Sequence, residues 1–412
     1  MQRVWSFVQE YSALLVLGAL VALVWANVDP ASYHAIVEYP LWENAPIGHL
    51  HDGHRTLTLH FLVNDILMAL FFAVAGKEVW EAVALKNGSL RGKKALTPLI
   101  ATAGGMIGPV AVYLLGAALI GKFGLLASGW AIPTATDIAF SYLVGRMVFG
   151  AGHPAVMFLL LLAIADDAGG LIILAIFYPQ GDLAPAWLLL SLAAALLTWF
   201  VANRLPRMMD GNDPSKRVSS AFMRRFSFWP YLIGGAISWY GFHHAGIHPA
   251  LGLLPIIPTI PHSETDFGVY AEEERFLGDL LNRIEHALKT PVQLILMLFG
   301  LANAGVEFSA IDATTALVLA GLIIGKPLGI AFMGWLAAKP LGLGLPEGMR
   351  MSDLVVIGFV AAIGFTVALF VAGVAFPPGA EQDAAKMGAL FSFGAAALAI
   401  IAGKVMKVER RA

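Results

Sequence analysis

Two adjacent carboxylates in the middle of an apolar run constrain this chain more than any other feature. Asp166 and Asp167 interrupt the stretch 158–177, FLLLLAIADDAGGLIILAIF. A run of about 20 apolar residues is long enough to cross a bilayer as a helix. One charged side chain near the bilayer centre costs about 2.5–3.5 kcal/mol on insertion scales. We therefore expect the pair to face protein or water, to be partly protonated, or to hold a cation.

The composition is that of a polytopic membrane protein. The chain is 58% hydrophobic and only 13% charged, whereas a soluble protein carries about 25% charged residues. There is no cysteine, which excludes disulfides and thiolate metal sites. The net charge of −2 gives no indication of nucleic acid binding. The first apolar run, 11–25, lacks a convincing cleavage site, so we interpret it as a retained span rather than a signal peptide.

The apolar runs predict about twelve spanning helices in a single transmembrane domain, 1–412. They begin near Tyr11, Leu59, Leu96, Leu125, Ala155, Ala186, Trp229, Ile247, Pro291, Ala316, Leu354 and Met387. Lys and Arg concentrate on alternate loops, whereas the opposite loops hold only Arg55, Lys122 and Lys386. The positive-inside rule then places both termini in the cytoplasm, with 204–228 and 261–290 as cytoplasmic loops.

The longest loop on the opposite side, 27–58, is too polar to span and is predicted to be a small periplasmic β-hairpin. Its segment Tyr33–Tyr39 carries strand-like residues. His49, His51, Asp52 and His54 follow, but their spacing matches no standard zinc pattern. A solvated hairpin or a partner contact is therefore favoured over a metal site. On the cytoplasmic side, 262–289 predicts an amphipathic helix whose acidic residues form a solvated face.

A first helix break is predicted in the stretch GWAIPTATDIAFSYL, 129–143. Pro133 removes a backbone donor, and polar side chains follow at once, which is typical of an interrupted transmembrane helix. Such a break leaves a positive and a negative helix end inside the membrane. Asp137 can neutralise the positive end, and Thr136 offers a hydroxyl oxygen to a cation. The alternative is that Asp137 is a helix cap without a role in transport.

A second break is predicted in IGFTVALF, where Gly364 and Thr366 loosen the span 355–375. Two interrupted segments at matching places in two halves are typical of an inverted-repeat transporter with its ion site between them. Lys326, in the apolar stretch LIIGKPLGIAF, needs an anionic partner unless it snorkels to an interface. Asp166 or Asp167 would be that partner.

These residue types predict a site for cations and protons. A hard cation such as Na⁺ prefers carboxylate, hydroxyl and carbonyl oxygens, by analogy with other hard ions. The same carboxylates bind protons, and close carboxylates titrate as a coupled system. If Na⁺ and H⁺ compete for Asp166 and Asp167, and the site opens alternately to the two sides, the result is exchange.

The motifs together resemble the NhaA family of bacterial Na⁺/H⁺ antiporters. The resemblance rests on Asn64-Asp65 followed by LMALFF, AIPTATDIAF, AIADDAGG, ANAGV at 302–306, GKPLGI at 325–330 and GFT at 364–366. These motifs occur in family order from about residue 59 to 375. The resemblance implies an all-α fold of twelve spans with inverted-topology repeats and two crossing broken helices. It also implies an inner-membrane antiporter that expels Na⁺ or Li⁺ using inward proton flow, is electrogenic and pH-regulated, and needs no cofactor.

The resemblance also implies roles for individual residues. Asp167 would be the main ion ligand, with Asp166 and Thr136 beside it. Lys326 would pair with Asp166 in one protonation state, and Asp137 would compensate the helix ends. Four further matched positions would be structural: Asp65, Pro133, Gly364 and Thr366. Three others would form the pH-sensing cytoplasmic mouth: Glu78, Glu285 and His286. The outside hairpin would join a homodimer.

Departures from the family pattern concern regulation. Family members place basic residues after the glutamate that matches Glu78, whereas here Lys77 precedes it and Trp80 and Glu81 follow. Lys289 stands where some relatives have His. We therefore expect a shifted or weaker alkaline activation.

Three other functions compete with this one. An intramembrane aspartyl protease needs a second Asp in a Gly-x-Gly-Asp setting, which this chain lacks. Lys326 would also hold an Asp ionised, which does not suit a dyad that shares one proton. A Na⁺-coupled solute symporter of related architecture is nearer, but it needs a polar substrate cavity, and the spans offer few polar residues beyond the ion site. A scaffold protein without transport is the third alternative.

Overall fold

The computed structural model describes residues 2–51, 54–84, 89–90, 92–210, 218–261 and 280–411. The chain divides into two compact units. Unit 1 comprises Met1–Tyr39, Asn87–Leu174 and Leu296–Ala412, and unit 2 comprises Pro40–Lys86 and Ala175–Ile295.

Unit 1 is helical and contains both predicted breaks. Its elements are α1 (Gln2–Val28), α2 (Pro30–Val37), α5 (Lys93–Leu119), α6 (Phe123–Leu126), η2 (Ala127–Thr134), α7 (Ile138–Phe149), most of α8 (Pro154–Phe177), η8 (Phe308–Ala310), α15 (Ala313–Ala320), η9 (Gly321–Gly325), α16 (Lys326–Ala338), α17 (Met351–Ala361), α18 (Phe365–Ala375), α19 (Ala380–Phe391) and α20 (Gly394–Val405).

Unit 2 holds the small sheet and the remaining helices. Its elements are β1 (Pro40–Glu43), β2 (His49–His51), β3 (His54–Thr58), α3 (Leu59–Phe61), η1 (Leu62–Leu67), α4 (Met68–Ala84), η3 (Pro185–Trp187), α9 (Leu188–Trp199), η4 (Phe200–Arg204), α10 (Leu205–Met208), α11 (Val218–Phe226), α12 (Trp229–Ala245), η6 (Pro249–Leu251), η7 (Leu254–Thr259) and the first part of α14 (Leu280–Asn303).

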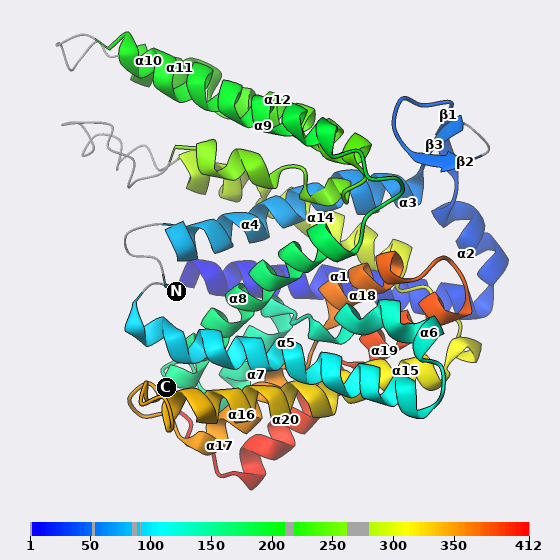
Figure 1. Ribbon diagram of the computed structural model, residues 1–412, viewed down its shortest axis with the longest axis vertical. Helices are drawn as coiled ribbons and strands as arrows, with labels where there is room; N and C mark the ends of the chain where they lie inside the picture. Colours follow the sequence, from blue (N-terminus) through cyan, green and yellow to red (C-terminus); the bar gives the residue numbers. More distant parts are fainter. Residues whose placement is uncertain are drawn as a thin grey trace. The chain divides into compact units, whose positions relative to one another are not determined.

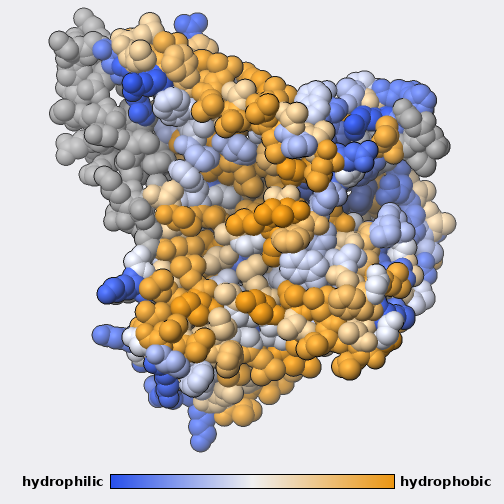
Figure 2. Space-filling view, in the orientation of Figure 1, coloured by the Kyte–Doolittle hydropathy of each residue, from blue (hydrophilic) through white to orange (hydrophobic). Residues whose placement is uncertain are grey.

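The long helices have the length and surface of membrane spans. Six helical stretches in the described residues are long and apolar enough to cross a membrane, or seven if the bent pair α17 and α18 is one span. The six are Leu59–Ala84, Ala95–Leu119, Pro154–Phe177, Pro185–Met208, Ala313–Ala338 and Ala380–Val405. Apolar side chains cover much of the visible surface (Figure 2), which in water would be unfavourable. The protein is therefore a multi-pass membrane protein, and the expected number of twelve spans stays a prediction.

Glycines let α5 and α16 lie side by side (Figure 1). A side chain at Gly104 would meet the backbone of Gly329, and one at Gly108 would meet the backbone of Gly325. Small residues at such spacing allow close backbone approach between spanning helices. This contact fixes the start of α16, where Lys326 lies.

The segment Tyr33–Tyr39 is not a strand, and that expectation was wrong. Helix α2 covers Pro30–Val37 because Asp29 caps it by accepting a hydrogen bond from Ser32 N at 3.2 Å, and Pro30 occupies the first turn. The strands follow it as an antiparallel sheet of order β1-β3-β2. The loop 27–58 thus contains a helix followed by three short strands.

The predicted cytoplasmic loops are partly helical. The region 204–228 contains α10 and α11, and 211–217 lie outside the described residues. In the region 261–290, helix α14 begins at Leu280, and the predicted amphipathic stretch 262–279 lies outside the described residues.

Candidate functional site

The first predicted break is present, and neighbouring groups form hydrogen bonds with the backbone groups that it frees. The 3-10 segment η2 ends at Thr134, the chain then runs extended through Ala135 to Asp137, and α7 begins at Ile138. Pro133 lies in the last turn of η2. The freed backbone N–H of Asp137 donates to Ile363 O at 2.7 Å.

The second predicted break lies against the first. Helix α17 ends at Ala361 and α18 begins at Phe365, with a bend of 55° between them. Thr136 Oγ1 donates to Ala361 O at 3.1 Å, which bonds the two interruptions to each other. The two broken helices therefore meet at the residues where the helical hydrogen bonds of each are interrupted. Their freed backbone groups find partners there, as is required inside a membrane.

Asp137 caps two helices at this crossing. Its carboxylate accepts from Phe140 N of α7 at 3.3 Å. It also accepts from Thr366 N of α18 at 3.2 Å and from the Thr366 hydroxyl. A buried carboxylate at two positive helix ends compensates both of them.

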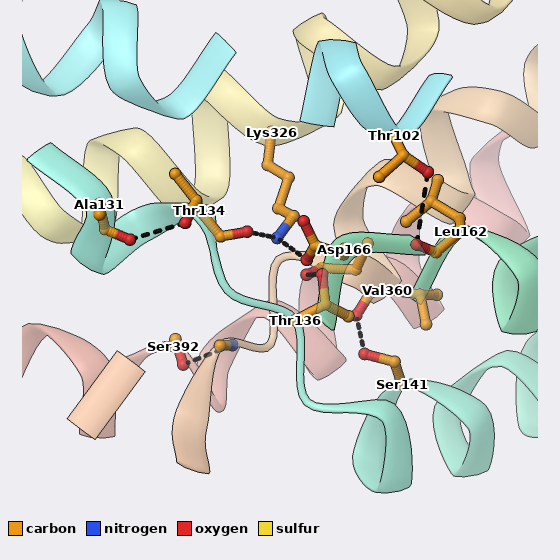
Figure 3. A network of polar contacts seen from close by, with 12 residues as sticks. Thr102, Ala131, Thr134, Thr136, Ser141, Leu162, Asp166, Lys326, Val360 and Ser392 are labelled. Carbon is orange, nitrogen blue, oxygen red and sulfur yellow. Dashed lines mark hydrogen bonds and ion pairs between the residues drawn. The ribbon is translucent and has the colours of Figure 1, made fainter. Parts of the chain in front are cut away.

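Lys326 and Asp166 form a buried ion pair beside the crossing. Lys326 Nζ lies 3.0 Å from Asp166 Oδ2, with relative exposures of 0% for Lys326 and 4% for Asp166. Lys326 Nζ also donates to Thr134 O, a carbonyl freed by the first break (Figure 3). The ammonium group therefore bridges the carboxylate of α8 and the negative end of η2. The π-helical turn η9 directly precedes Lys326, and such turns are frequent at functional sites.

Asp167 and Thr136 complete the group of oxygens. Thr136 lies within hydrogen-bonding reach of the Asp166 carboxylate. Asp167 follows Asp166 on α8, is less buried, and interacts electrostatically with Lys326. Successive residues on a helix point about 100° apart, so the two carboxylates have different surroundings. Thr102 of α5 donates to Leu162 O at 3.3 Å, one turn before the pair (Figure 3).

The other predicted residues lie in unit 2. Asp65 is buried in the π-helical turn η1, where its backbone O accepts from Trp239 Nε1 at 2.8 Å. Its Oδ1 lies 3.8 Å from His248 Nδ1. Glu78 lies on α4, and the side chains of Glu285 and His286 on α14 lie outside the described part of the chain.

Among the residues that the structure describes, no three His, Cys, Asp or Glu side chains gather as metal ligands. Asp52 and the His51 side chain of the hairpin lie outside that part. The polar centre of unit 1 instead offers carboxylate, hydroxyl and carbonyl oxygens together with one ammonium group. Such a set can hold protons, a small cation, or both in turn.

Comparison with known proteins decides the family. The sequence profile described as Na⁺/H⁺ antiporter 1 matches residues 3–405. The chain belongs to this antiporter family. It is 67% identical over 418 residues to "Na(+)/H(+) antiporter NhaA" of Jannaschia sp. (strain CCS1), with 100% of both chains covered. It is 47% identical to "Na(+)/H(+) antiporter NhaA" of Desulfitobacterium hafniense (strain DCB-2), covering 98% of this chain and 96% of the relative.

Among solved structures, the chain is similar to a sodium proton antiporter from Methanocaldococcus jannaschii at pH 8. That similarity has a TM-score of 0.46 and 12% sequence identity, with 98% of this chain and 97% of the other covered. Likeness at this level does not establish a common fold.

In this antiporter, sequence reasoning missed two serines that hold the second break. Ser141 Oγ donates to Val360 O at 3.0 Å, and Ser392 Oγ accepts from Gly364 N at 3.2 Å. Both serines are fully buried. The available signal was a lone serine in each of two apolar runs, because a buried hydroxyl in a spanning helix needs a partner.

Proposed function

We propose that this antiporter expels Na⁺ or Li⁺ in exchange for protons by competition of the two ions at Asp166 and Asp167. The observation that carries the proposal is the buried Lys326–Asp166 pair at the meeting point of two broken helices. A Lys in an apolar span is costly unless it is paired or loses its proton. Here the pair lies beside a second carboxylate.

Charge balance links the two ions. With Lys326 protonated and bound to Asp166, the site already contains one positive charge, and a Na⁺ ion would be repelled by the ammonium group. Na⁺ at Asp167 and Asp166 therefore requires Lys326 to move away or to lose its proton. A proton held by Asp167 must also leave. Na⁺ binding releases a proton when Lys326 loses its proton or when Asp167 gives up the proton that it holds, and proton binding releases Na⁺ by the reverse step. Movement of Lys326 alone releases no proton.

The oxygens around the pair suit this cargo. Asp167 is the proposed main ligand of the ion, with Asp166 and Thr136 beside it. Lys326 is proposed to pair with Asp166 when Na⁺ is absent and to leave Asp166, or to lose its proton, when Na⁺ binds. Asp137 compensates the helix ends whether or not the site holds an ion, because it bonds to α7 and α18 rather than to the pair. Exchange of more than one proton for one Na⁺ would make the transport electrogenic.

The wider architecture is part of the proposal. We infer twelve spans in inverted-topology repeats, both termini in the cytoplasm, and a bacterial inner membrane location. The loop around β1 presents Tyr39, Leu41 and Trp42 with relative exposures of 59%, 46% and 56%. Because an exposed edge strand with apolar residues readily pairs with another chain, we propose that it joins two copies as a homodimer.

Regulation by pH is proposed to involve Glu78, Glu285 and His286 at the cytoplasmic mouth. Lys77 is buried beside this position and pairs with Glu81 at 2.9 Å, one helical turn on. This fixed pair on α4 supports a shifted or weaker alkaline activation. A pH profile that matches a family member without this lysine would contradict it.

The test uses everted vesicles with a preset acid-inside gradient, to which Na⁺, Li⁺ or K⁺ is added. Collapse of the gradient with Na⁺ or Li⁺, lost in Asp167→Asn and kept in the matched control Asp182→Asn, supports both function and site. Asp182 is exposed and lies outside the crossing. No response to any cation would contradict exchange and favour the symporter, to be examined by Na⁺-driven solute uptake. A response kept by Asp167→Asn would retain the function and reject the site.

A further inference from the structure

The residues after α20 fold back onto the ends of other helices in unit 1. Arg411 N donates to Phe149 O at 3.0 Å, and Gly152 N donates to Arg411 O at 3.2 Å. The two bonds form a reciprocal backbone bridge between the tail and the turn that joins α7 to α8. Gly150 in that turn has a φ of +84°, and a side chain there would meet the Arg411 backbone. The turn is therefore shaped to admit the tail.

The same tail contacts the loop before α17. Glu409 pairs with Arg350, which directly precedes α17, and the Arg411 guanidinium lies against Gly348. Arg410 also donates to Met147 O near the end of α7. Residues 409–411 thus bond to the end of α7, to the turn that precedes α8 and to the residue preceding α17. These helices carry Asp137, the carboxylate pair and the second break.

His153 lies at the centre of this contact. Its relative exposure is only 5%, and its ring stacks on that of Phe149 with the ring centroids 5.3 Å apart. Its Nδ1 accepts a hydrogen bond from Ala155 N, in the first turn of α8, at 3.1 Å. The charged groups that act on it are Asp353 and Arg350 at the start of α17, and Glu409 and Arg411 of the tail. Burial lowers the pKa of His153, and of these charges the two arginines add to that shift and the two carboxylates oppose it.

We propose that His153 and residues 409–411 form a clasp, a positioning element that holds the start of α8 and loosens when His153 is protonated from the cytoplasmic side. Protonated imidazole donates from both nitrogens, so it cannot accept from Ala155 N. It also adds a cation beside Arg350 and Arg411. Because α8 continues unbroken from Pro154 to Asp166, a shift at its start changes where the carboxylates meet Thr136 and Lys326.

This inference rests on the proposed role of Asp166 and Asp167, and the experiment separates the two. The apparent KM for Na⁺ is measured in everted vesicles, where the medium contacts the cytoplasmic face. The pH series runs from above the ordinary His pKa of about 6.5 to well below it, because burial lowers the pKa of His153. His153→Asn keeps an acceptor for Ala155 N and cannot titrate, whereas His153→Ala removes the acceptor.

We expect His153→Asn to match the parent above that pH and to show a smaller rise in KM below it. His153→Ala should raise KM at every pH, by up to about fivefold, the fold-change that corresponds to the ~1 kcal/mol of stability lost with one helix cap. A rise in KM at acid pH that is equal in His153→Asn and the parent would overturn the proposal. Exchange by Asp167→Asn is measured in parallel. Its loss supports the proposed ion site, and its persistence rejects that site independently of the result for His153.

A second pair of variants tests the backbone bridge. Arg411→Pro removes the N–H that donates to Phe149 O, whereas Arg411→Ala removes the same side chain and keeps that N–H. A KM that is higher in the Pro variant than in the Ala variant, at equal amounts of protein in the membrane, supports the clasp. Equal KM values in both variants and the parent would overturn it.

Discussion

Thr366 reaches across the crossing of the two broken helices to bond Asp137 through both its backbone N–H and its hydroxyl. Asp137 in turn accepts from Phe140 N, so one carboxylate closes the first turns of α7 and α18. The two interruptions are therefore held by one shared anion rather than by two separate caps. A change at Asp137 should affect both helices together.

Replacement of Asp137 is the first prediction. Asp137→Asn keeps an acceptor oxygen but removes the charge that faces two positive helix ends, each worth up to about 2 kcal/mol in buried geometry. We expect a lower unfolding temperature and a large loss of exchange. Thr366→Val, which removes one donor and keeps the charge, should cost less, about 1 kcal/mol. Thermal unfolding in detergent gives both values, and a Thr366→Val effect as large as that of Asp137→Asn would contradict the shared-anion account.

The buried ion pair gives a second prediction. Lys326→Gln leaves Asp166 buried without its charged partner, which typically costs 3–5 kcal/mol. The double variant Lys326→Gln/Asp166→Asn should recover much of the stability, because neither charge is then uncompensated. Glu409→Gln in the exposed pair with Arg350 is the control and should cost less than about 1 kcal/mol. Additive single and double effects would show that Lys326 and Asp166 do not interact.

Packing of α5 on α16 gives a third prediction. Gly108→Ala places a methyl group against the backbone of Gly325 and Gly329, and overpacking of this kind typically costs 1–3 kcal/mol. The start of α16 should move, so exchange should fall as well. Gly124→Ala in α6 meets no atom within 4 Å and should be neutral or slightly stabilising. Equal unfolding temperatures of the two variants would rule out the close contact.

Acid stability gives a fourth prediction. Because burial lowers the pKa of His153 in the folded protein, the unfolded chain binds the proton first as pH falls below about 6.5. His153 therefore contributes its full stability above that pH and loses it progressively on acidification. His153→Asn should flatten this part of the profile of unfolding temperature against pH. An unchanged acid slope would show that His153 does not titrate on unfolding.

Much of the candidate site could be predicted because charged residues in apolar runs are costly and must find partners. Both breaks follow from Pro133 and Gly364, and the buried charges predict that Lys326 pairs with one of the two carboxylates. The choice of Asp166 over Asp167 was implied only by the family resemblance. The tail contact could not be predicted in this way, because the bridge from Arg411 to Phe149 and Gly152 is made by backbone groups that every residue except proline possesses.

The strand expectation at Tyr33–Tyr39 failed for a local reason. Its aromatic and branched residues fit a half-buried strand, but Asp29 and Pro30 start a helix there. Tyr33 then faces the interior of unit 1, where its hydroxyl donates to Leu301 O at 2.8 Å. Capping and tertiary contact outweighed the intrinsic preference of the segment, as is common for short stretches.

The central claim is that Na⁺ and protons compete for the carboxylate pair. It is tested most directly by adding Na⁺ to the purified protein in weakly buffered detergent solution and recording proton release. We predict release from the parent and from Asp182→Asn, and none from Asp167→Asn. Na⁺ binding by the parent without proton release, or release that persists in Asp167→Asn, would contradict the account.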